Sequence, residues 1–183
     1  MASKGREFLN DRLISFIKEQ KLFFVATAAP DGRVNLSPKG MDTLKVISET
    51  RIVWLNLSGS GNETAAHLRE LDRMTLMFCA FEDKPMILRV YGRARAYHPR
   101  DPGWDRLSPL FPALPGSRQI FDLDIDLVQT SCGTGVPVYE FKRDRGETEL
   151  LPFYDAMGEE GVRAYWERKN QTSIDGKPTG TTG

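Results

Sequence analysis

Apolar and polar side chains alternate with a period of two over several short segments, which is the pattern of half-buried β-strands. Val34 and Leu36, for example, alternate with Asn35 and Ser37. The segments that this alternation or a short apolar run predicts to be strands are 21–28, 33–37, 44–48, 51–57, 73–81, 86–97, 119–131 and 138–141. Most are joined by short loops, such as the Pro-Asp-Gly turn at 30–32, so neighbouring strands are expected to form hairpins.

Helical spacing of apolar residues occurs at both ends of the chain and once in the middle. It predicts an amphipathic helix at 8–20, a short helix at 62–71 with Asn62 as its N-cap, and a surface helix at 158–170. A proline-rich connection occupies 99–116. With six or seven of these short-looped segments forming the sheet and one inserted helix, the pattern indicates a mainly β (α+β) fold, an antiparallel barrel with peripheral helices.

The domain organisation follows from length and from the composition of the end. A chain of 183 residues without a central Pro/Gly-rich linker is predicted to be a single domain spanning 1–175. The polar sequence after it, 176–183, is rich in Gly and Thr, so we expect a flexible tail.

Composition restricts the classes of partner. Twenty-five basic and 25 acidic residues give zero net charge, which argues against nucleic acid or an anionic membrane as the main partner. The sequence has no apolar signal core and no run of about 20 apolar residues, so a cytoplasmic protein is expected. Two histidines and two cysteines, with no cysteine beside either histidine, predict no metal site.

Two segments are candidates for an anion site. Residues 57–64 leave a strand through two glycines and two serines and enter a helix, whose free N–H groups attract anions. A flexible loop with an ordinary N-cap explains this segment equally well. Lys39 follows Pro38 at a strand end, where it is either a solvated turn lysine or a fixed cation facing the helix start. The sequence identifies no catalytic residue.

A third pattern is a pair of charged stripes. Arg89, Arg93 and Arg95 alternate along one predicted strand, and Asp122, Asp124 and Asp126 alternate along another. Facing strands would pair these opposite charges, so we expect carboxylate partners for the arginines and no binding of nucleic acid.

The segments 26–40, 54–68 and 78–93 together resemble the pyridoxamine 5'-phosphate oxidase-like, FMN-binding split-barrel family, in a branch described only as oxidase-related. They contain "SPKG" at 37–40, "GSGNET" at 59–64 and "LRVYGR" at 88–93. The resemblance implies a six-stranded split barrel that forms a homodimer, with FMN in clefts between the subunits. The residues it implies for the cofactor are Arg33, Val34, Asn35, Leu36, Ser37, Lys39, Gly40, Trp54, Leu55, Asn56, Asn62, Glu63 and Thr64.

The function implied is that of an FMN-dependent oxidoreductase acting on an unidentified small molecule. One departure matters: the family's helix start carries two cations for the phosphate, whereas this chain has Asn62, Glu63 and Thr64. That difference favours an alternative, a non-catalytic or stress-associated split barrel that holds flavin, deazaflavin or haem.

Overall fold

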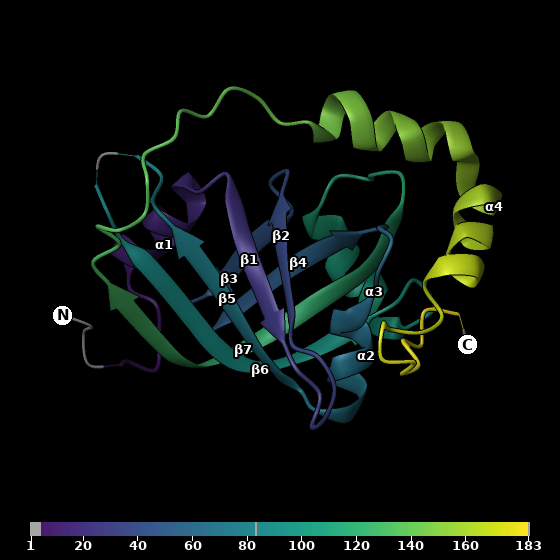
Figure 1. Ribbon diagram of the computed structural model, residues 1–183, viewed down its shortest axis with the longest axis horizontal. Helices are drawn as coiled ribbons and strands as arrows, with labels where there is room; N and C mark the ends of the chain where they lie inside the picture. Colours follow the sequence, from purple (N-terminus) through teal and green to yellow (C-terminus); the bar gives the residue numbers. More distant parts are fainter. Residues whose placement is uncertain (1–4, 83, 183) are drawn as a thin grey trace.

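Seven antiparallel strands form one strongly curled sheet in the order β2-β1-β5-β6-β7-β4-β3 (Figure 1). The computed structural model describes residues 5–82 and 84–182. The strands are β1 (Leu22–Thr27), β2 (Asn35–Gly40), β3 (Leu44–Ser48), β4 (Arg51–Leu57), β5 (Arg73–Cys79), β6 (Ile87–Tyr97) and β7 (Ser117–Ser131). Because β2 and β3 are both edges of the sheet, the barrel stays split between them.

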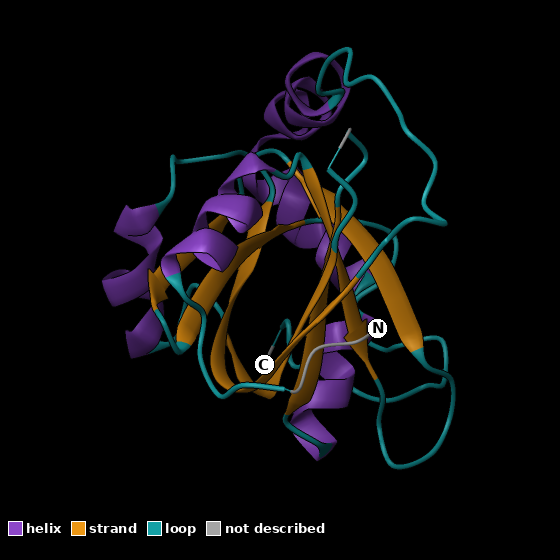
Figure 2. Ribbon diagram, turned by 90° about the vertical axis from the view of Figure 1, so that its left-hand side faces the viewer, coloured by secondary structure: helices purple, strands orange, loops and turns teal. Residues whose placement is uncertain are grey.

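Helices lie outside the curled sheet (Figure 2). They are α1 (Asp11–Glu19), α2 (Glu63–Glu70), α3 (Pro102–Leu107) with the short turn η1 (Ser108–Leu110), and the turn η2 (Gly146–Leu150) leading into α4 (Leu151–Lys169). The predicted fold class is therefore confirmed, with seven strands in place of six. The C-terminal helix begins earlier than predicted, and Gly158, with φ of 68°, kinks it where the predicted helix was to start.

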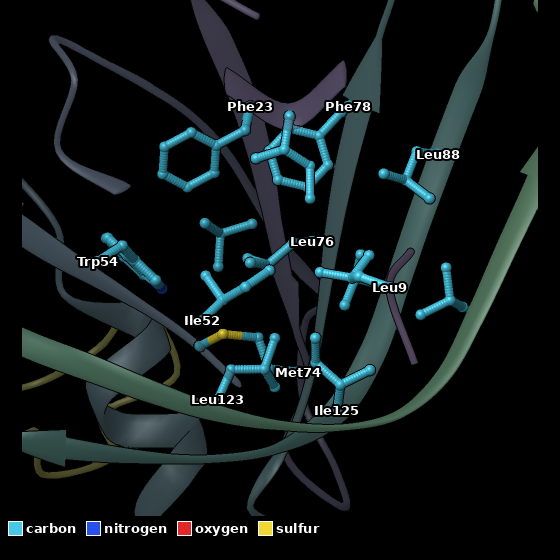
Figure 3. Packing of buried hydrophobic residues seen from close by; sticks show 14 of the residues in the cluster. Leu9, Phe23, Ile52, Trp54, Met74, Leu76, Phe78, Leu88, Leu123 and Ile125 are labelled. Atoms are coloured by element: carbon cyan, nitrogen blue, oxygen red, sulfur yellow. The ribbon is translucent and has the colours of Figure 1, made fainter. Parts of the chain in front are cut away.

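The barrel core is built from apolar side chains of both halves of the sheet (Figure 3). Trp54 stacks on Phe121 with ring centroids 4.5 Å apart, and Phe23 packs between Trp54 and Phe78. Leu9 and the buried side of α1 add to the same cluster. These contacts fix the part of β4 around Trp54. The end of this strand leads into residues 58–61, here called the Gly/Ser loop.

The register of the β1–β2 hairpin turns the polar residues of β2 inward. Lys39 pairs with Phe23, Ser37 with Val25 and Asn35 with Thr27. Phe23, Val25 and Thr27 are all buried. Directly paired residues of antiparallel strands share a face of the sheet. Asn35, Ser37 and Lys39 therefore face the interior side.

The apolar residues of the same segment point the other way. Val34 and Leu36 are 74% and 62% exposed. The alternation that predicted a strand here is thus inverted relative to an ordinary half-buried strand, because the edge strand presents its polar face to the barrel interior.

The predicted strand 138–141 is wrong. This segment makes one described backbone hydrogen bond, from the Tyr139 N–H to the Phe81 carbonyl (2.8 Å), and Val138 and Tyr139 are exposed. It belongs to the long connection from β7 to η2 in Figure 1. Its apolar alternation does not become a strand, because it forms no ladder with any of the described strands.

The charged stripes face each other as predicted, but their ion pairs differ. Arg93 lies opposite Asp124 and Arg95 opposite Asp122 in the β6–β7 ladder. However, Asp122 accepts two hydrogen bonds from Arg51 of β4 (2.8 and 2.7 Å), while Arg93 pairs with Asp72. Arg89 donates to Ser131, which is no carboxylate. Asp122 was expected to pair with an arginine of β6, but its bidentate partner is Arg51 of the other neighbouring strand, β4.

The predicted tail, 176–183, is folded against the rest of the protein as far as residue 182. Thr179 and Thr181 are 1% and 5% exposed, and residues 171–179 fold back on themselves, with the Thr179 N–H donating to the Gln171 carbonyl (3.0 Å). The composition of this segment suggested disorder, but specific tertiary hydrogen bonds order it. Residues 1–4 of the predicted domain and residue 183 of the predicted tail lie outside the described residues.

Within the described ranges, no helix is long and apolar enough to cross a membrane. The cytoplasmic location stays a prediction.

Candidate functional site

A cavity of about 800 Å³ opens where β2, the Gly/Ser loop after β4 and the start of α2 meet the C-terminal segment. Ten of the 13 residues implied by the family resemblance line it: Arg33, Val34, Asn35, Leu36, Ser37, Lys39, Asn56, Asn62, Glu63 and Thr64. Two segments that lie far apart in sequence, 33–39 and 56–64, are therefore brought together at one site. The hydrogen bond from the Asn35 amide to the Thr64 hydroxyl (3.1 Å) joins them directly.

Three of the implied residues do not line this cavity. Trp54 and Leu55 are buried in the two apolar clusters of the protein, because consecutive residues of β4 face opposite sides of a covered sheet. Gly40 ends β2, where its carbonyl accepts a hydrogen bond from the Thr43 hydroxyl (2.8 Å). Trp54 still contacts the site indirectly, since the Lys39 ammonium lies 5.7 Å from its ring centroid.

Lys39 is a fixed cation inside the cavity rather than a solvated turn lysine. Burial, and then the positive charge of Arg118, lower the pKa of Lys39 to about 8, with Glu63 acting in the opposite direction. Its ammonium makes no hydrogen bond or salt bridge to any of the residues that the structure describes, and it lies over the Trp54 ring in a cation–π interaction. The polar face of β2 thus places an amine without a counter-ion at the cavity wall.

Arg118 is the second cation of the cavity, and the sequence reasoning missed it. Its side chain belongs to β7 and is buried, with 3% of the residue exposed. The guanidinium donates to the Asn170 side-chain oxygen (2.7 Å), the Gly61 carbonyl (3.1 Å) and the Gln119 side-chain oxygen (3.1 Å). All three acceptors are neutral, and no described carboxylate forms a salt bridge with it. Burial lowers its pKa to about 10.

The half-buried Lys39 and the buried Arg118, neither with a carboxylate partner among the described residues, make the cavity electropositive. Burying an uncompensated charge costs several kcal/mol, so such groups normally have an anionic partner. Here the acid that influences the pKa of both cations is Glu63. Its carboxylate folds over Gly61 and accepts the Ile174 N–H (3.3 Å). The donor set therefore suits an anionic ligand.

The helix start adds a polar group that lacks a partner. Asn62 occupies the N-cap position of α2 as predicted, but its side chain does not cap the helix. Its amide instead donates to the Thr181 hydroxyl (2.6 Å), and its side-chain oxygen is buried without a hydrogen-bond partner in the described structure. This leaves the first N–H groups of α2 without a side-chain cap beside the two cations, which favours anions at the same place.

The Gly/Ser loop is held from behind by α4 and β7. Trp166 donates its indole N–H to the Ser58 hydroxyl (2.6 Å), which in turn donates to the Gly116 carbonyl (2.7 Å). The Asn170 amide donates to the Gly59 carbonyl (2.9 Å). This loop is therefore positioned by polar contacts along its length, and is not the flexible loop that was the alternative interpretation.

No group of three or more His, Cys, Asp or Glu side chains is arranged to hold a metal ion in the described part of the chain.

Comparison with known proteins supports the class that this fold defines, a split β-barrel. The family model described as Pyridoxamine 5'-phosphate oxidase matches residues 9–132. The pyridoxamine 5'-phosphate oxidase family protein ustO of Aspergillus flavus is 34% identical over 189 aligned residues, covering 94% of this chain and 76% of that protein.

Two solved structures show the same architecture at low identity. HupZ of Group A Streptococcus has a TM-score of 0.52 at 13% identity, covering 66% of this chain and 91% of that chain. A candidate pyridoxamine 5'-phosphate oxidase of Lactobacillus delbrueckii has a TM-score of 0.53 at 16% identity, covering 67% of this chain and 94% of that chain. This chain belongs to the pyridoxamine 5'-phosphate oxidase family.

Proposed function

We propose that this protein binds FMN in the cavity beside β2 and acts as a flavin-dependent oxidoreductase on a small molecule. The observation that carries the proposal is a pair of cations, the half-buried Lys39 and the buried Arg118, that line one cavity without a carboxylate partner in the described chain. Family membership and the resemblance of residues 33–40 and 57–64 to the flavin-binding segments support the same ligand.

The residues present fit each part of FMN. Lys39, Arg118 and the uncapped start of α2 supply the positive charge and N–H donors that a phosphate requires. β2 is a sheet edge, so the strand has a side without a strand partner along which a flat ring can lie. Arg118 also replaces, from β7, the cations that Glu63 and Thr64 do not provide at the helix start.

The absence of an identified catalytic residue in the sequence is compatible with this function. Bound flavin supplies hydride and electron transfer itself, so the protein must mainly hold and tune it. Lys39, with a pKa of about 8, can hold or release a proton at its Nζ near neutral pH. The Gly/Ser loop and the C-terminal segment form walls of the cavity.

The alternative, a non-catalytic split barrel, is favoured by Glu63. Its carboxylate lies at the helix start, where it would repel a phosphate. In that case a bound flavin should not be reduced or reoxidised faster with any small-molecule partner than free FMN.

A homodimer is part of the proposal. Val34 and Leu36 are exposed apolar residues at the rim of the cavity, and a second copy of the chain would cover them and complete the cleft, as the family resemblance implies. Light scattering at micromolar concentration should give twice the chain mass, and a mass near 20.7 kDa would contradict the dimer.

FMN titration tests the site. Lys39→Ala should weaken binding roughly ten- to a hundredfold, the effect of losing one charge-assisted hydrogen bond worth about 1.5–3 kcal/mol. The matched control is Lys45→Ala on β3, since Lys45 pairs with Asp42 (2.8 Å) and does not line the cavity. Flavin fluorescence measures both affinities. Equal affinity of Lys39→Ala and the parent removes Lys39 from the site, and a parent that binds no FMN refutes the proposal.

The pKa of Lys39 also predicts a pH dependence. The amine loses its charge as the pH rises through about 8, so the affinity of the parent for FMN should fall as the pH is raised through this value. Lys39→Ala should show a flat profile over the same range. A parent profile that is equally flat would show that the charge of Lys39 does not contribute to binding.

Pyridoxamine 5'-phosphate is not expected to be the substrate, although the fold is shared. Its phosphate needs a second cationic site. Arg33, which lines the cavity, is already paired with Asp175, and Lys177 of the C-terminal segment is paired with Asp31 and Glu70. Protein reconstituted with excess FMN should form pyridoxal 5'-phosphate far more slowly than the roughly one turnover per second or more that is typical of enzymes. Turnover in that range would identify the vitamin-pathway reaction as its activity.

A further inference from the structure

The C-terminal segment 171–182, here called the strap, forms one wall of the cavity. Thr172, Ser173 and Ile174 line the cavity. The strap doubles back at Gly176, whose φ is 75°, and the Ser173 N–H donates to the Lys177 carbonyl (2.8 Å) across this turn. In Figure 1 this segment (yellow) lies beside α2. The strap is therefore a compact loop with a tip at 175–177 and an end at 179–181.

The tip is fastened by ion pairs. Asp175 accepts the Arg33 backbone N–H (2.7 Å) and is paired with the Arg33 guanidinium. Lys177 donates to Asp31 (2.6 Å) and to both carboxylate oxygens of Glu70 (2.9 Å each). These contacts attach the tip to the β1–β2 turn and to the last residue of α2. Lys177, 15% exposed at its side chain, is thus a fixed residue and not a mobile tail cation.

The end of the strap is fastened differently. Thr181 accepts hydrogen bonds from the amides of Asn62 (2.6 Å) and Gln119 (3.3 Å), and its carbonyl accepts one from Arg100 (2.8 Å). Thr179 bonds to the Asn170 carbonyl. This end is buried and its partners are neutral side chains or backbone groups, apart from the cation Arg100. The tip, in contrast, depends on ion pairs whose other members, Arg33 and Asp31, are largely exposed.

The attachments of the tip and of the end differ in their sensitivity to salt. Ion pairs with a largely exposed member are weakened by salt, whereas buried hydrogen bonds between neutral groups are screened much less. Segments open first where their contacts are few and exposed. Since the cavity wall 172–174 lies directly before the tip, loss of the tip contacts would free that wall while the end stays attached.

We infer that the strap is a salt-sensitive flap that closes over the ligand, and that Asp175 and Lys177 are positioning residues that hold it closed. The flap opens at its tip, about the buried end at Thr179 and Thr181, to let the ligand enter and leave. This inference deepens the proposed function and rests on it for the identity of the ligand, for which FMN is the probe.

The test compares Lys177→Met, Asp175→Asn and the conservative Lys177→Arg with the parent. Lys177→Met and Asp175→Asn should speed FMN dissociation roughly three- to tenfold, the range expected when a partly exposed ion-pair cluster is lost. Lys177→Arg should stay near the parent. Raising the salt concentration should speed dissociation from the parent by a larger factor than from Lys177→Met, which keeps only the Arg33–Asp175 pair at the tip. The control is Arg163→Met, which removes the exposed pair with Glu159 on α4.

Amide hydrogen exchange of the protein without ligand gives a readout that does not depend on FMN. Lys177→Met should exchange faster at residues 172–177 while 179–181 stay protected. If FMN does not bind the parent, the proposed function fails, but faster exchange confined to the tip still supports the flap. Unchanged exchange in both Lys177→Met and Asp175→Asn overturns it. Faster exchange with an unchanged dissociation rate of FMN shows that the strap moves but does not retain the ligand, which also overturns it.

Discussion

The pairing of β2 with β1 decides what the cavity is made of. Because Lys39 lies opposite the buried Phe23, its side chain is directed to the inside of the barrel, where the Trp54 ring meets its ammonium. A shift of one residue in this register would turn Leu36 inward and Lys39 to solvent. The lysine without a counter-ion, the polar wall of Asn35 and Ser37, and the apolar rim of Val34 and Leu36 all follow from one hairpin register in the described structure.

The second constraint is the charge of Arg118. It comes from β7, on the other half of the sheet, and it is held by three neutral acceptors around the Gly/Ser loop. Together with Lys39 it gives the cavity a positive charge that the protein itself does not neutralise by a salt bridge in the described residues. Charges without a partner cost stability in general and favour the binding of an anion, in agreement with the proposed ligand.

Much of this could be predicted from the sequence, because hydrophobic periodicity and motif spacing are local. The seven described strands, from β1 to β7, lie where apolar alternation or a short apolar run predicted strands. The segments 33–39 and 56–64, which resemble flavin-binding segments, lie at one cavity. Arg118 could not be found in this way, since a single arginine at the start of an apolar strand has no local pattern that distinguishes it. The contacts of the predicted tail, 176–183, could not be found for a related reason. Its local composition indicates flexibility, whereas its hydrogen bonds are made to distant residues such as Gln119 and Glu70.

The central claim is that the cavity binds an anionic ligand through cations that lack a carboxylate partner among the described residues. Calorimetric titration with FMN and with riboflavin tests it most directly, because the two molecules differ only by the phosphate. The account predicts that FMN binds at least about tenfold more tightly, the difference that about 1.4 kcal/mol of phosphate contacts produces. Equal affinities for FMN and riboflavin would contradict it, since the charges of Lys39 and Arg118 would then have no part in holding the ligand.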